Sequence, residues 1–187
     1  MTRTKIVLAG EGGQGVQSVA KILVEAGYEA NKEILYIPNF GVEQRGGVSI
    51  AFCQIGDEKI GEPRFSKGDI VIMLSDRAIE RCQTYIDKNT VVIYDTSVCH
   101  TKPTVECKEV IGIPANQIAH DELSVRVFNI IILGVIIQAT KVMPIDFVKS
   151  AMEHALGKKF DKKPELRELN YKALDCGMKL VEKSQCV

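Results

Sequence analysis

Short, almost entirely apolar runs separated by polar or glycine-rich turns fill the first part of the chain. The first run, Lys5–Ala9, ends directly at a glycine, as a parallel strand buried on both faces does. Runs of similar character predict further strands at Ile34–Ile37, Val48–Ile55, Asp69–Leu74 and Thr90–Tyr94, and the more polar segment Val105–Ile111 is also predicted to be a strand. We expect Pro38 to stop the second of these strands, because proline cannot donate a backbone hydrogen bond.

Turn-forming residues flank the strand predicted at Val48–Ile55. The polar, glycine-rich segment Asn39–Gly47 (NFGVEQRGG) predicts a loop before it. After the strand, the pair Gly56-Asp57 is typical of a hairpin turn. Glu58–Gly61 would then form a short return strand.

Apolar residues recur at intervals of three and four in the segments between and after these strands. This period predicts helices at Gln14–Ala30, Asp76–Tyr85, Leu123–Lys141, Pro144–Leu156 and Pro164–Glu182. Asp76 or Ser75 is the expected N-cap of the second helix. The long third helix is apolar on most sides, so we expect it to be buried. Between the last two helices, Gly157–Lys163 (GKKFDKK) predicts a basic, solvated linker, with contact to an anionic partner as the alternative.

Strands alternate with helices early in the chain, and helices gather late. This order predicts an α/β fold, Rossmann-like and doubly wound. The sheet would be mainly parallel, with helices on both faces and a helical C-terminal part from about residue 123. The 187 residues fit a single domain, residues 1–187, with one core.

Composition narrows the possible partners. Lys and Arg together number 24, as do Asp and Glu, so the chain lacks the positive charge on which nucleic-acid binding depends. The six cysteines include no C-x-x-C pair, which predicts free thiols in a reducing cytoplasm and not a metal or cluster site. No signal peptide is visible, and the apolar stretch Ile130–Ala139 is too short to span a bilayer. We therefore expect a cytoplasmic protein that binds neither membranes nor nucleic acids.

A glycine-rich turn follows the first predicted strand and opens the first predicted helix. Gly10, Gly12 and Gly15 match the pattern G-x-G-x-x-G in the context that gives the pattern meaning. Bare backbone at Gly12 and Gly13 would let a ligand or another chain approach closely. The amides that begin the helix would face the ligand or chain bound there, with the positive end of the helix dipole behind them.

A dinucleotide is not the favoured ligand of this turn. A nucleotide-binding fold of this kind needs an acidic residue at the tip of the next strand to hold the ribose. Here that strand runs into Asn39, while Glu33 lies at its opposite end. The turn also lacks the Lys-Ser/Thr ending of a P-loop. A free-standing nucleotide-binding oxidoreductase therefore remains only an alternative.

The loop after the second predicted strand carries Arg45, Gly46 and Gly47. In a doubly wound sheet this loop lies beside the first turn, at the edge where ligands bind. A guanidinium next to bare backbone suits a phosphate or a carboxylate. We expect the two glycine clusters to line one crevice, although Arg45 could instead pair with Glu43.

These motifs together resemble a known family. GEGGQGV near the N-terminus, followed by NFGVEQRGGVSIAFCQI, resembles the γ subunits of 2-oxoacid:ferredoxin oxidoreductases. The later IPANQIAHDEL and VFNIIILGVIIQA are similar to that family's final section, where Asn129 and Gly134 take the places of an Asn and a Gly. The resemblance runs from Ile6 to about Lys141.

The resemblance implies a subunit of an enzyme that decarboxylates a 2-oxoacid to an acyl-CoA and passes the electrons to ferredoxin. Thiamine diphosphate, Mg²⁺ and iron–sulfur clusters would belong to partner subunits (α, β and a ferredoxin-like δ), with coenzyme A as co-substrate. This chain would bind no cofactor alone, dock on the thiamine-binding subunits and help to form the coenzyme A or substrate pocket. The residues carried over as ligand or docking residues are Gly12, Gly13, Gln14, Gly15, Arg45, Gly46, Gly47 and Asn129.

The residues themselves agree with this division of labour. Close cysteine pairs are missing. The pairs Gly56-Asp57 and Gly68-Asp69 are not followed by the glycine that completes the G-D-G motif of thiamine diphosphate enzymes. We assign no catalytic residue and no metal ligand to the chain, and expect it to be inactive alone. Asn129 either faces the crevice or bonds to a loop carbonyl in the core. Pyruvate, 2-oxoglutarate, ketoisovalerate and indolepyruvate all remain candidate substrates, and a purely structural adaptor is the further alternative.

Overall fold

The computed structural model describes residues 3–40 and 47–184. Six strands form one sheet in the order β2-β3-β1-β4-β5-β6. Their bounds are β1 (Thr4–Glu11), β2 (Glu33–Asn39), β3 (Val48–Gly56), β4 (Ile70–Met73), β5 (Val91–Asp95) and β6 (Glu109–Ile113). β1, β4, β5 and β6 pair in parallel, whereas β3 runs antiparallel to both β1 and β2. The mainly parallel sheet predicted from the sequence is confirmed, with β3 inserted in the opposite direction.

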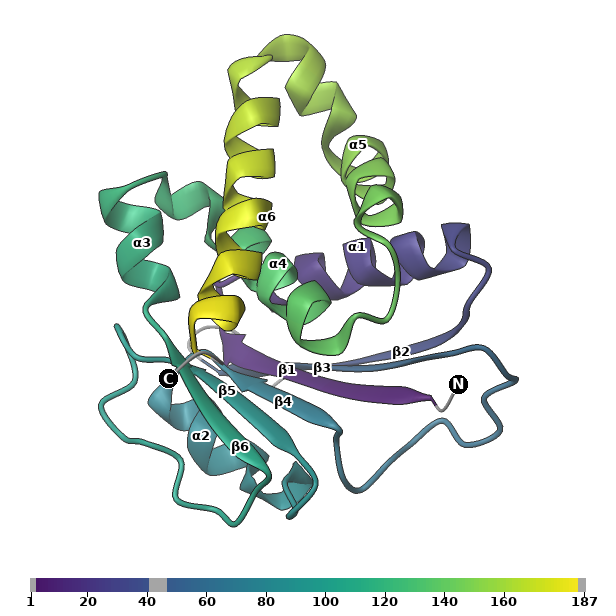
Figure 1. Ribbon diagram of the computed structural model, residues 1–187, viewed down its shortest axis with the longest axis vertical. Helices are drawn as coiled ribbons and strands as arrows, with labels where there is room; N and C mark the ends of the chain where they lie inside the picture. Colours follow the sequence, from purple (N-terminus) through teal and green to yellow (C-terminus); the bar gives the residue numbers. More distant parts are fainter. Residues whose placement is uncertain (1–2, 41–46, 185–187) are drawn as a thin grey trace.

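Helices cover both faces of the sheet (Figure 1), as the alternating pattern predicted. α2 lies on one face, while α1, α4 and α6 lie on the other, and α5 packs outside α1. The helices are α1 (Val16–Glu29), α2 (Asp76–Cys82), α3 (Ala115–Asp121), α4 (Phe128–Thr140), α5 (Ile145–Lys162) and α6 (Glu165–Ser184). Two short 3₁₀ turns, η1 (Gln83–Tyr85) and η2 (Val125–Val127), follow α2 and precede α4. Ser75 is the N-cap of α2, and its hydroxyl accepts a hydrogen bond from the Ala78 amide.

Three strand predictions were wrong in detail. β2 continues through Pro38 to Asn39, because β2 is an edge strand and a proline there can leave its missing donor on the unpaired side. The return strand expected at Glu58–Gly61 does not form, and residues 57–69 cross to β4 as a loop. β6 begins at Glu109, so most of Val105–Ile111 precedes it.

Three helix predictions also need correction. α3 was missed, and the single helix predicted over Leu123–Lys141 is η2 followed by α4. The expected basic linker at Gly157–Lys163 belongs largely to α5, which runs on to Lys162. Phe160 explains this continuation, because its side chain is only 1% exposed and burying a ring stabilises one more helical turn.

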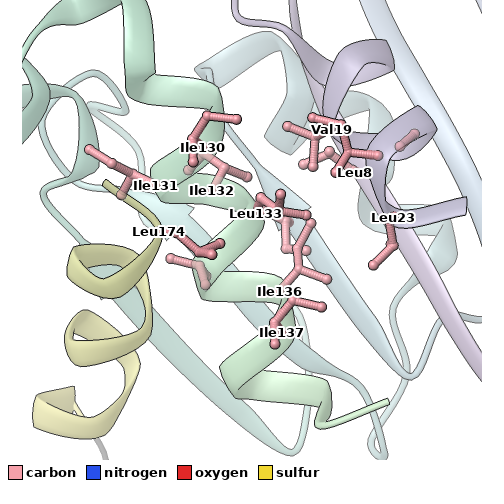
Figure 2. Packing of buried hydrophobic residues seen from close by; sticks show 14 of the residues in the cluster. Leu8, Val19, Leu23, Ile130, Ile131, Ile132, Leu133, Ile136, Ile137 and Leu174 are labelled. Atoms are coloured by element: carbon pink, nitrogen blue, oxygen red, sulfur yellow. The ribbon is translucent and has the colours of Figure 1, made fainter. Parts of the chain in front are cut away.

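α4 is the centre of the larger core. Figure 2 shows its isoleucines and Leu133 between α1, which contributes Val19 and Leu23, and α6, which contributes Leu174. The burial predicted for this helix is confirmed. Within the described residues, no helix combines the length and the apolar character that crossing a bilayer requires.

Two glycines allow α4 and α6 to cross in close contact. A Cβ atom on Gly134 of α4 would lie 2.1 Å from the Leu174 carbonyl oxygen of α6. A Cβ atom on Gly177 of α6 would lie 2.0 Å from the Ile131 carbonyl oxygen of α4. The two helices therefore touch backbone to backbone, which fixes α6 over the sheet.

Candidate functional site

The glycine-rich turn leaves β1 at its carboxyl end and enters α1. Gly10 is still within β1, and its missing Cβ leaves room for the side chain of Gln14, whose Oε1 would be 2.5 Å away. Gly13 has φ +101° and Gly15, the N-cap of α1, has φ +77°. Such left-handed backbone favours glycine at both positions.

Gln14 holds the turn closed. Its Oε1 accepts a hydrogen bond of 2.6 Å from the Glu11 amide, and its Nε2 donates one of 2.8 Å to the Leu74 carbonyl after β4. Both ends of the side-chain amide are thus engaged by backbone. These bonds give Gln14 a positioning role between β1 and the end of β4. Its contact with a ligand or a subunit stays a prediction.

Gly12 and Gly13 have no packing reason to lack a side chain. A Cβ atom on either glycine would meet nothing within 4 Å. Together with the first turn of α1 and Ser49 of β3, they line a crevice of about 360 Å³. α1 has no side-chain cap and no acidic residue in its first turn, so its leading amides face this crevice. A bare backbone beside free helix N–H groups suits an anion such as a phosphate.

A hydrogen-bonded network that sequence reasoning missed holds one wall of the crevice. Gln17 of α1 donates from Nε2 to Ser49 Oγ (2.8 Å) and to the Ile50 carbonyl (3.1 Å). Tyr36 of β2 donates its hydroxyl hydrogen to Gln17 Oε1. Because Ser49 accepts from Gln17, its own hydroxyl hydrogen is available to the crevice. No local pattern in the sequence singles out Gln17, because its hydrogen-bond partners lie on β2 and β3.

Asn129 lies beside the turn. A Cβ atom on Gly15 would lie 2.7 Å from the Asn129 Cβ, so these two residues from α1 and α4 are in contact. The absence of a side chain at Gly15 therefore allows α1 to begin in close contact with α4. No hydrogen bond of the Asn129 side chain occurs within residues 3–40 and 47–184, so the alternative of a bond to a loop carbonyl is not realised in this part of the chain. Its role toward a ligand or a subunit stays a prediction.

The second glycine-rich loop can be followed only in part. Arg45 and Gly46 lie outside the described residues, so their predicted role stays a prediction. Gly47 is described, and the next residue, Val48, pairs with Glu11 at the start of the turn. The end of this loop and the turn therefore meet at one edge of the sheet, as the sequence predicted.

Asp95 joins β5 to α3. The carboxylate, 0% exposed, accepts hydrogen bonds of 2.9 Å from the amides of Ser97 and Asn116. Burial raises the pKa of Asp95, while these hydrogen bonds act in the opposite direction. With its oxygens used to begin α3, Asp95 has a structural role at this edge.

The three buried cysteines do not suit a metal or cluster site. Burial raises the pKa of the Cys53, Cys82 and Cys99 thiols to about 12, so they are protonated at neutral pH and are poor ligands. Among the described residues, three potential metal ligands come together only at Glu25, Glu29 and His154. His154 Nδ1 lies 3.3 Å from Glu25 and 2.9 Å from Glu29, which links α5 to α1.

A charged cluster ties α5 to α6. Arg167 binds Glu153 through two hydrogen bonds of 2.8 and 3.1 Å, and the Tyr171 hydroxyl donates to Glu153 at 2.6 Å. These contacts, led by Arg167, lower the pKa of Glu153. The cluster joins α5 and α6, the helical hairpin that rises from the sheet in Figure 1.

The fold and the crevice together define a Rossmann-like α/β domain with an open, glycine-rich turn at the carboxyl edge of its sheet. The chain belongs to the pyruvate ferredoxin/flavodoxin oxidoreductase family, whose model matches residues 5–180. This finding confirms the resemblance inferred from the two glycine signatures. The family is one of oxidoreductases.

Known relatives place the chain within that family. The ketoisovalerate oxidoreductase subunit VorA of Methanothermobacter marburgensis is 28% identical over 92% of this chain and 35% of its own length. The chain thus spans about a third of that relative's length. The 2-oxoglutarate synthase subunit KorC of Methanocaldococcus jannaschii is 33% identical over 82% of both chains.

A solved structure confirms the fold. The 2-oxoglutarate:ferredoxin oxidoreductase of Magnetococcus marinus, with 2-oxoglutarate, coenzyme A and succinyl-CoA bound, matches with a TM-score of 0.87 and 24% identity. The match covers 98% of this chain and 32% of that one. The domain described here therefore occurs there as one part of a longer chain.

Proposed function

We propose that this chain is the γ-type subunit of a cytoplasmic 2-oxoacid:ferredoxin oxidoreductase, and that its glycine-rich turn binds an anionic group of coenzyme A. The enzyme would convert a 2-oxoacid to an acyl-CoA and pass the electrons to ferredoxin. Family membership and the names of the relatives support the proposal that this chain is one subunit of a larger enzyme. The uncapped start of α1 beside Gly12 and Gly13 carries the proposal for the turn.

The turn would act by binding and orienting. Phosphate oxygens of coenzyme A would accept hydrogen bonds from the leading amides of α1, and the helix dipole would favour their charge. The Ser49 hydroxyl, positioned by Gln17, would supply one side-chain donor. Gln14 would keep the turn in register with β4. The Magnetococcus enzyme, which has the same fold over this domain, binds coenzyme A, and this observation supports the choice of ligand.

The redox chemistry would belong to partner subunits. Thiamine diphosphate with Mg²⁺ supports decarboxylation of 2-oxoacids, and iron–sulfur clusters carry single electrons. The described residues of this chain offer no fitting set of ligands for a cluster, since the thiols with raised pKa values are buried and dispersed. Docking on α and β subunits, and on a ferredoxin-like δ subunit, is accordingly part of the proposal.

Co-purification tests this function. The tagged chain should be expressed together with the products of its neighbouring reading frames and purified as an assembly. We expect an assembly that reduces ferredoxin only when a 2-oxoacid and coenzyme A are both present. Pyruvate, 2-oxoglutarate, ketoisovalerate and indolepyruvate, compared by kcat/KM, would identify the substrate. Recovery of a lone chain that binds NAD or FAD tightly in calorimetry would instead support a free-standing nucleotide-binding oxidoreductase.

A further inference from the structure

A groove lined by aromatic rings lies on the sheet face opposite the crevice. Side chains alternate along β3, so Ser49 faces α1 while Phe52 points to the other side. Phe52 meets Phe65 at 5.8 Å and Tyr85 at 5.1 Å between ring centroids, both edge to face. With the end of β2 and residues 63–65, these rings enclose a groove of about 490 Å³.

The walls of the groove are fixed before anything binds. Gln54 of β3 donates to the carbonyls of Glu62 (2.9 Å) and Pro63 (3.1 Å), which holds one wall against the sheet. Lys67 donates to the carbonyls of Thr84 and Ile86 on either side of Tyr85. A groove with preformed walls lowers the ordering cost of binding a partner.

The rim of the groove combines an exposed ring with an exposed cation. Phe40 is 67% exposed at the end of β2. Arg64 also lines the groove, is exposed, and has no ion pair or hydrogen bond within the described part of the chain. Aromatic residues and arginine are the side chains most enriched in the binding centres of protein interfaces. An unpaired guanidinium beside apolar rings calls for a carboxylate on the occupant.

We propose that this groove is the docking site for a polypeptide segment of a partner subunit, which inserts an apolar side chain between Phe40 and Phe52 and pairs a carboxylate with Arg64. The inference rests on the proposed function, because it takes the partner from the same oxidoreductase assembly. It adds the surface and the chemistry of the contact. The groove lies on the face away from the crevice, so docking there leaves the glycine-rich turn open to coenzyme A.

Two observations favour a polypeptide over a small molecule. β2 is the last strand in the sheet and, among the described residues, pairs with β3 alone, so an extended segment can lie along its outer edge. The chain also spans only about a third of the length of VorA, so in that relative the domain is joined to further polypeptide. A flanking domain or subunit needs a contact surface, and this groove provides an apolar one.

The test uses the intact assembly, purified through a tag on a partner subunit and diluted stepwise under mass photometry. Arg64→Glu reverses the rim charge, and Phe40→Ser removes an exposed ring without opening the core. Matched controls are Arg126→Glu on η2 and Tyr28→Ser on α1, which are exposed residues away from the groove. Thermal melting of each variant verifies folding.

We expect Arg64→Glu and Phe40→Ser to weaken association of this chain at least tenfold, and the two controls to change it less than twofold. The Arg64→Glu effect should shrink as salt rises, because an exposed ion pair is screened. Wild-type-like association of both groove variants would overturn the docking site while leaving the proposed function intact. Failure of the wild-type chain to associate at all would instead overturn the proposed function.

Discussion

Gly15 and Asn129 are in direct contact, and this contact joins the glycine-rich turn to the centre of the core. Gly15 is the N-cap of α1, and a Cβ atom there would lie 2.7 Å from the Cβ of Asn129 on α4. α4 in turn crosses α6 through Gly134 and Gly177. The position of the crevice therefore depends on packing that reaches to the C-terminal helix.

Replacing Gly15 by alanine should destabilise the protein by about 3 kcal/mol, because left-handed backbone strain adds to a steric clash. Urea denaturation measures the loss. Gly13→Ala separates the two causes, since Gly13 has φ +101° but open space around its Cβ position. We expect it to cost only about 1 kcal/mol.

A double-mutant cycle isolates the clash. Asn129→Gly removes the Cβ that Gly15→Ala would meet, so the double variant should recover about 1–2 kcal/mol relative to additivity. Asn129→Ala keeps that Cβ and should recover almost nothing. Equal coupling for the two Asn129 variants would show that the contact is not the one described.

The crossing of α4 and α6 gives a second stability prediction. Gly134→Ala and Gly177→Ala each push a Cβ into a carbonyl oxygen of the other helix, and each should cost about 3 kcal/mol in chemical denaturation. Gly157→Ala in α5 is the control, because its Cβ would meet nothing within 4 Å. Removing that glycine from a helix interior should stabilise the protein by about 0.5–1 kcal/mol. Similar effects at all three sites would contradict the crossing.

The α5–α6 cluster predicts a dependence on pH. The pKa of Glu153 is lowered in the folded protein, mainly by Arg167, so its contribution to stability is present at neutral pH and is lost as pH falls through the lowered pKa. Glu153→Gln should therefore melt below the wild type at pH 7, and the gap should close under acidic conditions. Circular dichroism from about pH 7 to about pH 3 follows the two melting temperatures across the ordinary range of a Glu carboxyl. Glu80→Gln on α2 controls for general acid effects. A gap that does not change with pH would rule out this role.

Local patterns predicted most of the fold. Continuous apolar runs identified β1, β4 and β5, and helical spacing identified α1 and α6. The predictions failed at Pro38, where β2 was expected to end, and around Phe160, where a linker was expected in place of α5. Whether a proline ends a strand depends on whether that strand is at the sheet edge, and whether GKKFDKK is helical depends on a burial site for one ring. Both are tertiary facts that a local pattern does not contain.

The sequence predicted where the backbone of the candidate site lies, but it did not predict the hydrogen bonds that the side chains make there. Gly12 and Gly13 followed from the motif, and the meeting of the two loops followed from the topology. The hydrogen bonds of the Gln14 amide to the Glu11 amide and to the Leu74 carbonyl could not be read from the motif. Gln17, Ser49 and Tyr36 come from three different elements, so nothing short of the folded chain brings them together.

A negative charge introduced at position 12 tests most directly the claim that the glycine-rich turn binds coenzyme A. Gly12 does not have left-handed backbone, and its Cβ position is open, so the fold should accept Gly12→Asp and its neutral isostere Gly12→Asn. In the intact assembly, measured with saturating 2-oxoacid and ferredoxin, Gly12→Asp should raise the apparent KM for coenzyme A by about 10–100-fold, as expected for the loss of a charge-assisted contact. Gly12→Asn should also raise the apparent KM for coenzyme A, but by a factor several times smaller than Gly12→Asp does. An unchanged KM for coenzyme A in both variants would contradict the assignment of the turn to this ligand.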